Sequence, residues 1–138
     1  MKILFYNKYV EIKACKEKKF LGINQRQTIQ DTEELDKLVH NIQYYADVTK
    51  YDSIIFSVNT VDFSKESTLL DTHYLSDIHH SGIKNLLFIV PDDMTRDLYQ
   101  EEMRDFTENS GLQVEFFKNE QNAIQWITHK PKEILITQ

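Results

Sequence analysis

The stretch that decides the fold is Leu86-Leu87-Phe88-Ile89-Val90, five consecutive apolar residues followed at once by Pro91. A run of this length fits a β-strand, and the proline ends it because its ring nitrogen cannot donate a hydrogen bond to a sheet. A strand that is apolar at every position has both faces buried, which is typical of a parallel sheet covered by helices. We therefore expect these residues to form a central strand with helices packed over it.

Segments of strand and helix pattern alternate on both sides of this stretch. A further short, mainly apolar run, 54–58, and the segment Val114-Glu115-Phe116-Phe117 also predict strands. Apolar residues at helical spacing predict four helices: one that begins at Asp31, one over about 65–80, one over about 95–108 and one that begins at Asn119. In the third of these helices, the residues expected to face inward are Leu98, Tyr99, Met103 and Phe106.

The first 25 residues predict short strands. Apolar and polar residues alternate over 9–14, and the apolar stretch 20–23 follows a charged turn, so these two segments predict an antiparallel hairpin. The later strands are separated by helices, whose crossover connections make a largely parallel sheet. The predicted fold class is α/β, with a mixed, mostly parallel sheet, an N-terminal antiparallel hairpin and about four packed helices. We expect one domain, 1–130, and a strand-like tail, 131–138.

Two segments of the C-terminal half resemble a known family. The first is Gly82-Ile83-Lys84-Asn85-Leu86-Leu87-Phe88-Ile89-Val90-Pro91-Asp92-Asp93, a glycine, a hydrophobic strand and an acidic turn. The second runs from Gly111 to Phe117 and continues through Asn119-Glu120 to Ala123-Ile124-Gln125-Trp126-Ile127. They resemble the motifs of SpoIIAA-like proteins of the STAS fold, which is named for sulfate transporters and anti-sigma-factor antagonists, and the resemblance covers about residues 2–128. It implies a non-enzymatic regulatory or ligand-sensing module that docks a helix face onto a partner.

The sequence departs from this family in the turn after residues 54–58. Anti-sigma-factor antagonists that are switched by phosphorylation carry Asp-Ser-Ser-Gly there, whereas this chain has Asn59-Thr60-Val61-Asp62-Phe63-Ser64. Ser64 keeps a hydroxyl at a predicted helix start, where negative charge is favoured, so it is the candidate phosphorylation site. Asp62 and Glu66 would repel a phosphate, and the alternative role of Ser64 is to cap the helix.

Composition and motifs exclude several classes of function. The 16 basic and 22 acidic residues give a net charge of −6, so we expect no nucleic-acid partner. The three glycines stand apart from one another, which excludes the glycine motifs of dinucleotide and P-loop sites. The single cysteine, Cys15, cannot form an internal disulfide, and no apolar run has the length of a signal peptide or a membrane span. We expect a cytoplasmic protein that does not insert into membranes.

No arrangement of residues in the sequence predicts a reaction. His73, Asp77 and His80 share one face of a predicted helix, but three metal ligands must converge on one point and this spacing is more often a polar surface. Histidine, serine and acidic residues also show no spacing that indicates a nucleophile with its base. We therefore expect no catalytic residues, no metal, no cofactor and no enzymatic activity.

Two functions from different classes remain as hypotheses. In the first, the chain is a regulatory module that contacts a protein partner, which the sequence does not specify, through a surface or pocket at Phe63, Ser64, Leu70, Tyr74 and Ile78. In the second, it carries or senses an apolar small molecule, such as a lipid, between helix and sheet, in a pocket lined by Phe56, Phe63, Tyr74 and Phe88. The apolar tail, 133–138, is predicted to add to a sheet edge, either in its own subunit or in a second copy to form a homodimer.

Overall fold

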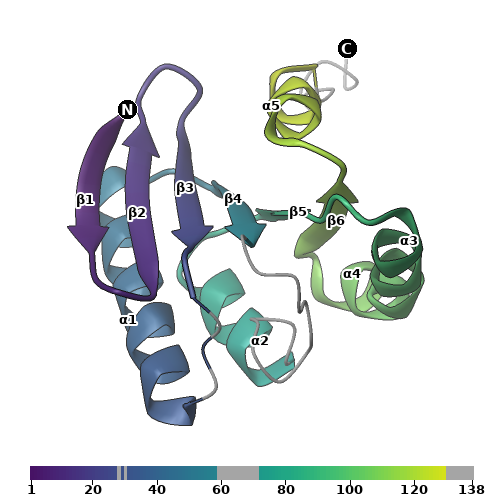
Figure 1. The fold of residues 1–138 in the computed structure, drawn as a ribbon, viewed down its shortest axis with the longest axis horizontal. Coiled ribbons are helices and arrows are strands. Elements are labelled where there is room, and N and C mark those ends of the chain that lie inside the picture. Colours follow the sequence, from purple (N-terminus) through teal and green to yellow (C-terminus); the bar gives the residue numbers. More distant parts are fainter. Residues whose placement is uncertain (28, 30, 59–71, 130–138) are drawn as a thin grey trace.

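The computed structural model describes residues 1–27, 29, 31–58 and 72–129, which form one six-stranded sheet with helices on both faces (Figure 1). The strands lie side by side in chain order: β1 (Lys2–Tyr6), β2 (Val10–Cys15), β3 (Phe20–Gln25), β4 (Ser53–Val58), β5 (Asn85–Ile89) and β6 (Gln113–Phe117). The β1–β2 and β2–β3 pairs are antiparallel, and β3 to β6 run parallel. The predicted α/β class with a mixed, mostly parallel sheet and an N-terminal antiparallel hairpin is confirmed.

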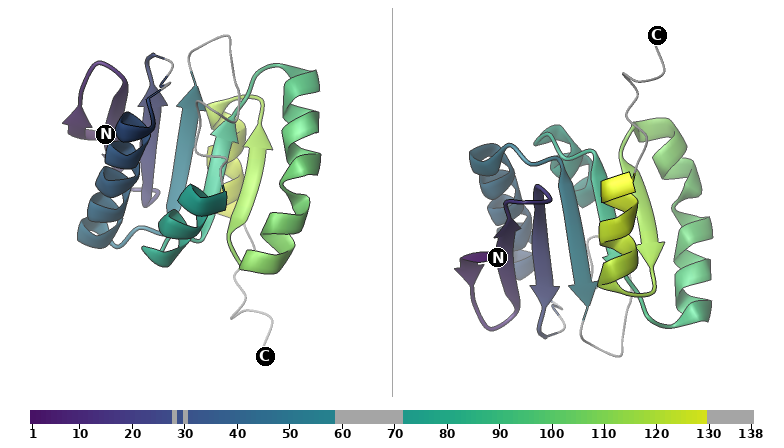
Figure 2. Two further views of the ribbon diagram at one scale, coloured as in Figure 1. Left: turned by 90° about the horizontal axis from the view of Figure 1, so that it is seen from below. Right: turned by 90° about the horizontal axis from the view of Figure 1, so that it is seen from above.

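The helices are distributed unequally over the two sheet faces. They are α1 (Thr32–Thr49), α2 (Thr72–His80), α3 (Asp93–Glu102), α4 (Arg104–Ser110) and α5 (Glu120–His129). Figure 2 shows α1 to α4 on one face and α5 on the other. Right-handed crossovers between successive neighbouring strands place all their helices on one face. Within the described residues α5 follows β6 without leading to a further strand, so this rule does not assign it to that face, and it packs on the opposite one.

The central strand has the burial that its sequence predicts. All five residues from Leu86 to Val90 are buried, and β5 is hydrogen-bonded to β4 on one side and to β6 on the other. On the face under α1 to α4, the Phe88 ring centroid lies 5.4 Å from those of Phe56 and Phe116. Leu87 points to the opposite face, where it belongs to the cluster under α5. The two-sided burial expected of this stretch is confirmed.

Side-chain caps define the helix starts that the sequence predicts. The Asp31 carboxylate accepts a hydrogen bond from the Glu33 N–H at 2.9 Å, so α1 begins after Asp31 as expected. The Asn119 amide oxygen accepts one from the Asn122 N–H at 2.9 Å at the start of α5. Gly111 ends α4 with φ of +85°, a left-handed conformation that favours glycine.

The predicted third helix is divided in two at Met103, and one of its inward residues was assigned wrongly. Leu98 is 62% exposed, whereas Tyr99 and Met103 are buried as expected. Successive helix residues point about 100° apart, so a helix whose Tyr99 faces the sheet turns Leu98 outward. After the break, the Thr107 hydroxyl on α4 accepts from the Val114 N–H at 3.3 Å.

The outer edge of β6 is covered by the helices beside it. The Phe116 N–H donates to the Gln100 amide oxygen of α3 at 3.2 Å, and Thr107 of α4 serves Val114 in the same way. An exposed strand edge offers unpaired N–H groups to other chains, and these two side chains satisfy them. The edge at β6 is therefore closed to strand addition at both positions.

Several predictions fall outside the described residues. The second predicted helix, 65–80, is described only from Thr72, and it ends at His80 ahead of Gly82, whose φ is +103°. Phe63, Ser64 and Leu70 lie in the undescribed segment 59–71, and the tail 131–138 also lies beyond the described part of the chain. The predicted phosphorylation site and the predicted strand addition by the tail therefore remain predictions.

Candidate functional site

The described residues of the predicted α2 surface lie in the core. Tyr74 is 8% exposed and Ile78 is fully buried, and both belong to the cluster between the sheet and its covering helices. The Tyr74 hydroxyl donates a hydrogen bond to the Asp36 carboxylate of α1 at 2.9 Å. These two side chains therefore hold α2 against α1 and the sheet, and the other three residues of the predicted surface or pocket, Phe63, Ser64 and Leu70, lie outside the described residues.

The core around Phe56 and Phe88 is filled by aromatic contacts. Both rings are fully buried, and each packs against the other at 5.4 Å between centroids. The Phe116 ring stacks on the far side of Phe88, with 17° between the ring planes. Here the two phenylalanines that were predicted to line a ligand pocket pack against each other.

The histidines of α2 make local contacts. His73 Nε2 lies 3.6 Å from an oxygen of Asp77, and His80 Nδ1 lies 2.7 Å from the Ser76 carbonyl oxygen one turn earlier. His79 Nδ1 lies 3.0 Å from the Ile83 carbonyl oxygen in the turn after the helix. Within the described residues, no three histidine, cysteine or acidic side chains come together closely enough to hold a metal ion.

A surface that sequence reasoning missed lies on the outer side of α3. Met94 and Leu98 are one helical turn apart and are 83% and 62% exposed. Thr95 and Asp97 complete a shallow hollow around them, and we call these four residues the α3 surface. Exposed apolar side chains that lie together on one helix face are typical of contact sites. In the sequence, this surface is indicated by the four-residue spacing of Met94 and Leu98, which gives the helix a second apolar stripe.

The surroundings of the α3 surface carry negative charge. Residues 92–108 contain seven acidic and two basic residues. Arg96 is 2.5 Å from Asp93, and Arg104 contacts Glu101, so each of the two cations is paired with an acid. The α3 surface thus has two exposed apolar side chains and is bordered by more acidic than basic residues.

The first turn of α3 is tied firmly to the sheet. The Arg96 guanidinium donates to the Val90 carbonyl oxygen at 2.9 Å, just after β5. The Asp92 carboxylate accepts from both the hydroxyl and the N–H of Thr95, at 2.6 and 2.8 Å. These hydrogen bonds hold the pKa of the Asp92 carboxyl below its ordinary value, because they favour the ionised form. Met94 is therefore presented from a fixed helix start.

Comparisons with protein-family models, with curated proteins and with solved structures find no match to this chain. None of the helices in the described part of the chain combines the length and the apolar character that crossing a bilayer requires.

Proposed function

We propose that the chain is a non-catalytic regulatory module that binds a protein partner through the α3 surface. The observation that carries this proposal is the exposure of Met94 and Leu98 on one face of a capped helix. Methionine and leucine are apolar anchors that a partner can bury, and a rim of charge gives such a contact its specificity. The resemblance to SpoIIAA-like proteins supports the proposal, because it implies docking by a helix face.

The charge around the α3 surface indicates the chemistry of the partner. The acidic residues that predominate over 92–108 favour a segment with basic side chains around an apolar centre. A second copy of this chain would bring its own acidic helix against the first, and like charges at close range oppose such a pairing. The partner we propose is therefore a different protein that presents a basic, amphipathic segment.

A matched pair of double variants tests this proposal. Tyr44 and Val48 on α1 are also one turn apart and are 61% and 58% exposed, and α1 lies at the opposite end of the sheet from α3 (Figure 1). We expect Met94→Ser/Leu98→Ser to lose at least about tenfold in affinity for a partner, since two apolar anchors are removed. Tyr44→Ser/Val48→Ser should bind as the wild type does.

The measurement is capture from a native extract followed by calorimetry with the purified partner. A true partner is retained by the wild type at low salt, released at high salt because its charges are screened, and not retained by the α3 variant. If every captured protein binds the two double variants equally, the α3 surface is not the docking site and the proposal fails.

A further inference from the structure

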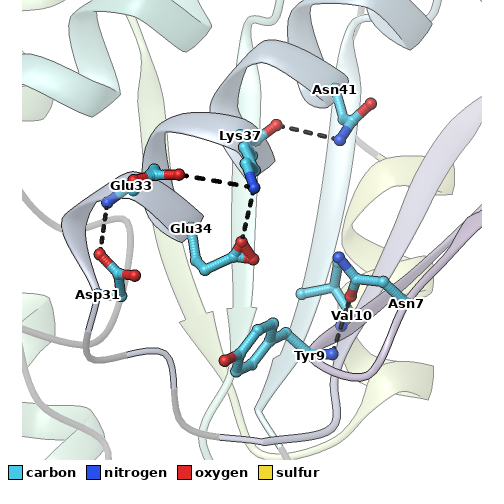
Figure 3. A network of polar contacts seen from close by, with 8 residues as sticks. All are labelled: Asn7, Tyr9, Val10, Asp31, Glu33, Glu34, Lys37 and Asn41. Carbon is cyan, nitrogen blue, oxygen red and sulfur yellow. Dashed lines mark hydrogen bonds and ion pairs between the residues drawn. The ribbon is translucent and has the colours of Figure 1, made fainter.

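A pocket of ≈ 330 Å³ lies between α1 and the turn that joins β1 to β2. It lies at the opposite end of the sheet from the α3 surface (Figure 1). Figure 3 shows the side chains of this region, with Glu34, Lys37 and Asn41 on α1 facing Asn7, Tyr9 and Val10 of the turn and β2. Its volume falls at the small end of the range for ligand sites, which is about 300 to 1,000 Å³.

The pocket lining combines apolar and polar residues. Five apolar residues from four segments of the chain contribute to it: Phe5, Tyr9, Val10, Ile29 and Leu38. Five polar residues complete it: Asn7, Glu34, Lys37, His40 and Asn41. Apolar walls with a few polar groups are the usual composition of a small-molecule site, since the walls supply affinity and the polar groups fix orientation.

Hydrogen bonds hold the walls of this pocket in place. The Asn7 amide oxygen accepts from the N–H groups of Tyr9 and Val10 at 2.8 and 2.9 Å, which fixes the turn that carries Tyr9. On the helix, Glu34, Leu38 and Asn41 line the pocket because their spacing places them on one face of α1. The Asn41 amide nitrogen donates to the Lys37 carbonyl oxygen at 3.1 Å. The pocket is thus formed before any ligand binds.

The pocket lining contains one acidic and one basic residue, Glu34 and Lys37. The Glu34 side chain is only 18% exposed, and its oxygen lies 3.3 Å from Lys37 Nζ. The Lys37 side chain is 61% exposed and its ammonium also lies 3.8 Å from Glu33, which is 77% exposed. Ion pairs of so exposed a lysine are weak, so Lys37 can stay with Glu33 when another cation approaches Glu34.

We propose that this pocket binds a small primary amine that carries an apolar ring or chain. The apolar body lies against Phe5 and Tyr9, the half-buried apolar side chains of the lining, and the ammonium group donates to the Glu34 carboxylate. A carboxylate ligand is disfavoured because Glu34 would repel it and Lys37 already serves two acids. A ligand without a donor is disfavoured because it would take more water from Glu34 and return no hydrogen bond. This site does not depend on the function proposed for the α3 surface.

Three phenyl probes of similar size and different charge test the proposal by NMR titration of the full-length protein: 2-phenylethylamine, 2-phenylethanol and phenylacetate. We expect the amine to shift the backbone amide signals of Asn7, Tyr9, Leu38 and Asn41 in a saturable manner. Its affinity should exceed that of the alcohol by about tenfold, the value of a charge-assisted hydrogen bond at a partly buried acid. Phenylacetate should bind more weakly than the alcohol.

Neighbouring residues provide matched variants. Glu33 and Glu34 both approach Lys37, but only Glu34 lines the pocket. We expect Glu34→Gln to weaken amine binding about tenfold and to leave the alcohol unchanged, and Glu33→Gln to change either by less than about twofold. Lys37→Met removes the competing cation and should tighten amine binding by about two- to fivefold.

The proposal is overturned by any of three results. The alcohol could bind the wild type as tightly as the amine, Glu33→Gln could weaken the amine as much as Glu34→Gln, or Lys37→Met could weaken amine binding. The amide spectrum of each variant reports whether its fold is kept, and Lys37→Met decides the question if Glu34→Gln is unfolded. Because the α3 surface lies elsewhere, the double variant Met94→Ser/Leu98→Ser should bind the amine normally.

Discussion

The sheet face under α1 to α4 and the face under α5 differ in how completely they are covered. On the first face, apolar residues from every strand join one continuous cluster with the helices. On the second face, the buried cluster is confined to the neighbourhood of α5 and consists of Phe20, Ile55, Leu87, Ile89 and Ala123. Figure 2 shows the same contrast, since α5 covers the second face and α1 to α4 cover the first.

The part of the second face that no described helix covers is lined mainly by polar residues. Glu11 and Lys13 project from β2 and pair at 3.4 Å, and Asn24 and Ser57 lie beside them on β3 and β4. Gly22 adds no side chain, and the result is an open hollow of ≈ 380 Å³ next to α5. The residue pattern of a strand therefore indicates how its faces are covered. β5 is apolar from Leu86 to Ile89 and has described helices on both faces, whereas β2 alternates and has a described helix on one face.

The largest effect should come from the centre of the well-covered face. Phe88→Ala removes a fully buried ring that contacts two other phenylalanine rings, so we expect a loss of about 3 to 5 kcal/mol in the free energy of unfolding. Lys13→Ala on the open face should change it by less than about 0.5 kcal/mol. Urea denaturation followed by circular dichroism measures both. Equal losses would mean that the better-covered face contributes no more to the free energy of unfolding than the open face does.

The next effect should come from the helix on the sparsely covered face. Trp126 of α5 is partly buried, and its ring centroid lies 6.2 Å from that of Phe117. We expect Trp126→Ala to cost about 2 kcal/mol, less than a fully buried aromatic residue because part of the indole stays in water. Gln125→Ala, an exposed neighbour on the same helix, is the control and should cost almost nothing. If Trp126→Ala lowered the free energy of unfolding more than Phe88→Ala does, the face under α5 would contribute more to stability than the face under α1 to α4.

The sequence predicts the features that depend on neighbouring residues. The apolar run at β5, the alternation in β2 and the caps at Asp31 and Asn119 are each decided within a few positions. The orientation of α3 is different, because Leu98 and Tyr99 are both apolar and adjacent, and only packing against β6 decides which of them turns inward. No glycine or proline stands at the break at Met103, so the sequence does not indicate it.

The candidate sites depend on distances between segments that no local pattern contains. The pocket beside α1 joins Phe5 of β1, Val10 of β2 and Leu38 of α1, which come together only when the hairpin packs under the helix. Each of these residues looks like an ordinary core position in the sequence. Glu34, the acidic residue of the pocket, lies near the start of the helix predicted from Asp31, and its sequence neighbours do not show which residues of the hairpin it meets.

The smallest effect on stability should come from the N-terminal caps of α3 and α5, of which only the cap of α3 carries a charge. Asp92 begins α3 on the well-covered face, whereas the neutral Asn119 begins α5 on the other. Because the folded pKa of Asp92 is lowered, its carboxylate adds stability above the pKa of the unfolded chain, and this stability is lost as the pH falls through the folded pKa. Asp92→Asn keeps an oxygen acceptor for Thr95 and removes the titration. We expect the wild type to be the more stable at neutral pH, and the difference to shrink in acid.

The reciprocal substitution should introduce a similar pH dependence at the start of α5. Asn119→Asp places a carboxylate where it can accept from the Asn122 N–H, so α5 should gain stability at neutral pH that disappears in acid. Urea unfolding of both variants and the wild type at neutral pH and below the ordinary aspartate pKa measures the two differences. If Asp92→Asn lowers stability equally at both pH values, the Asp92 charge contributes nothing, and the hydrogen-bond geometry alone holds the start of α3.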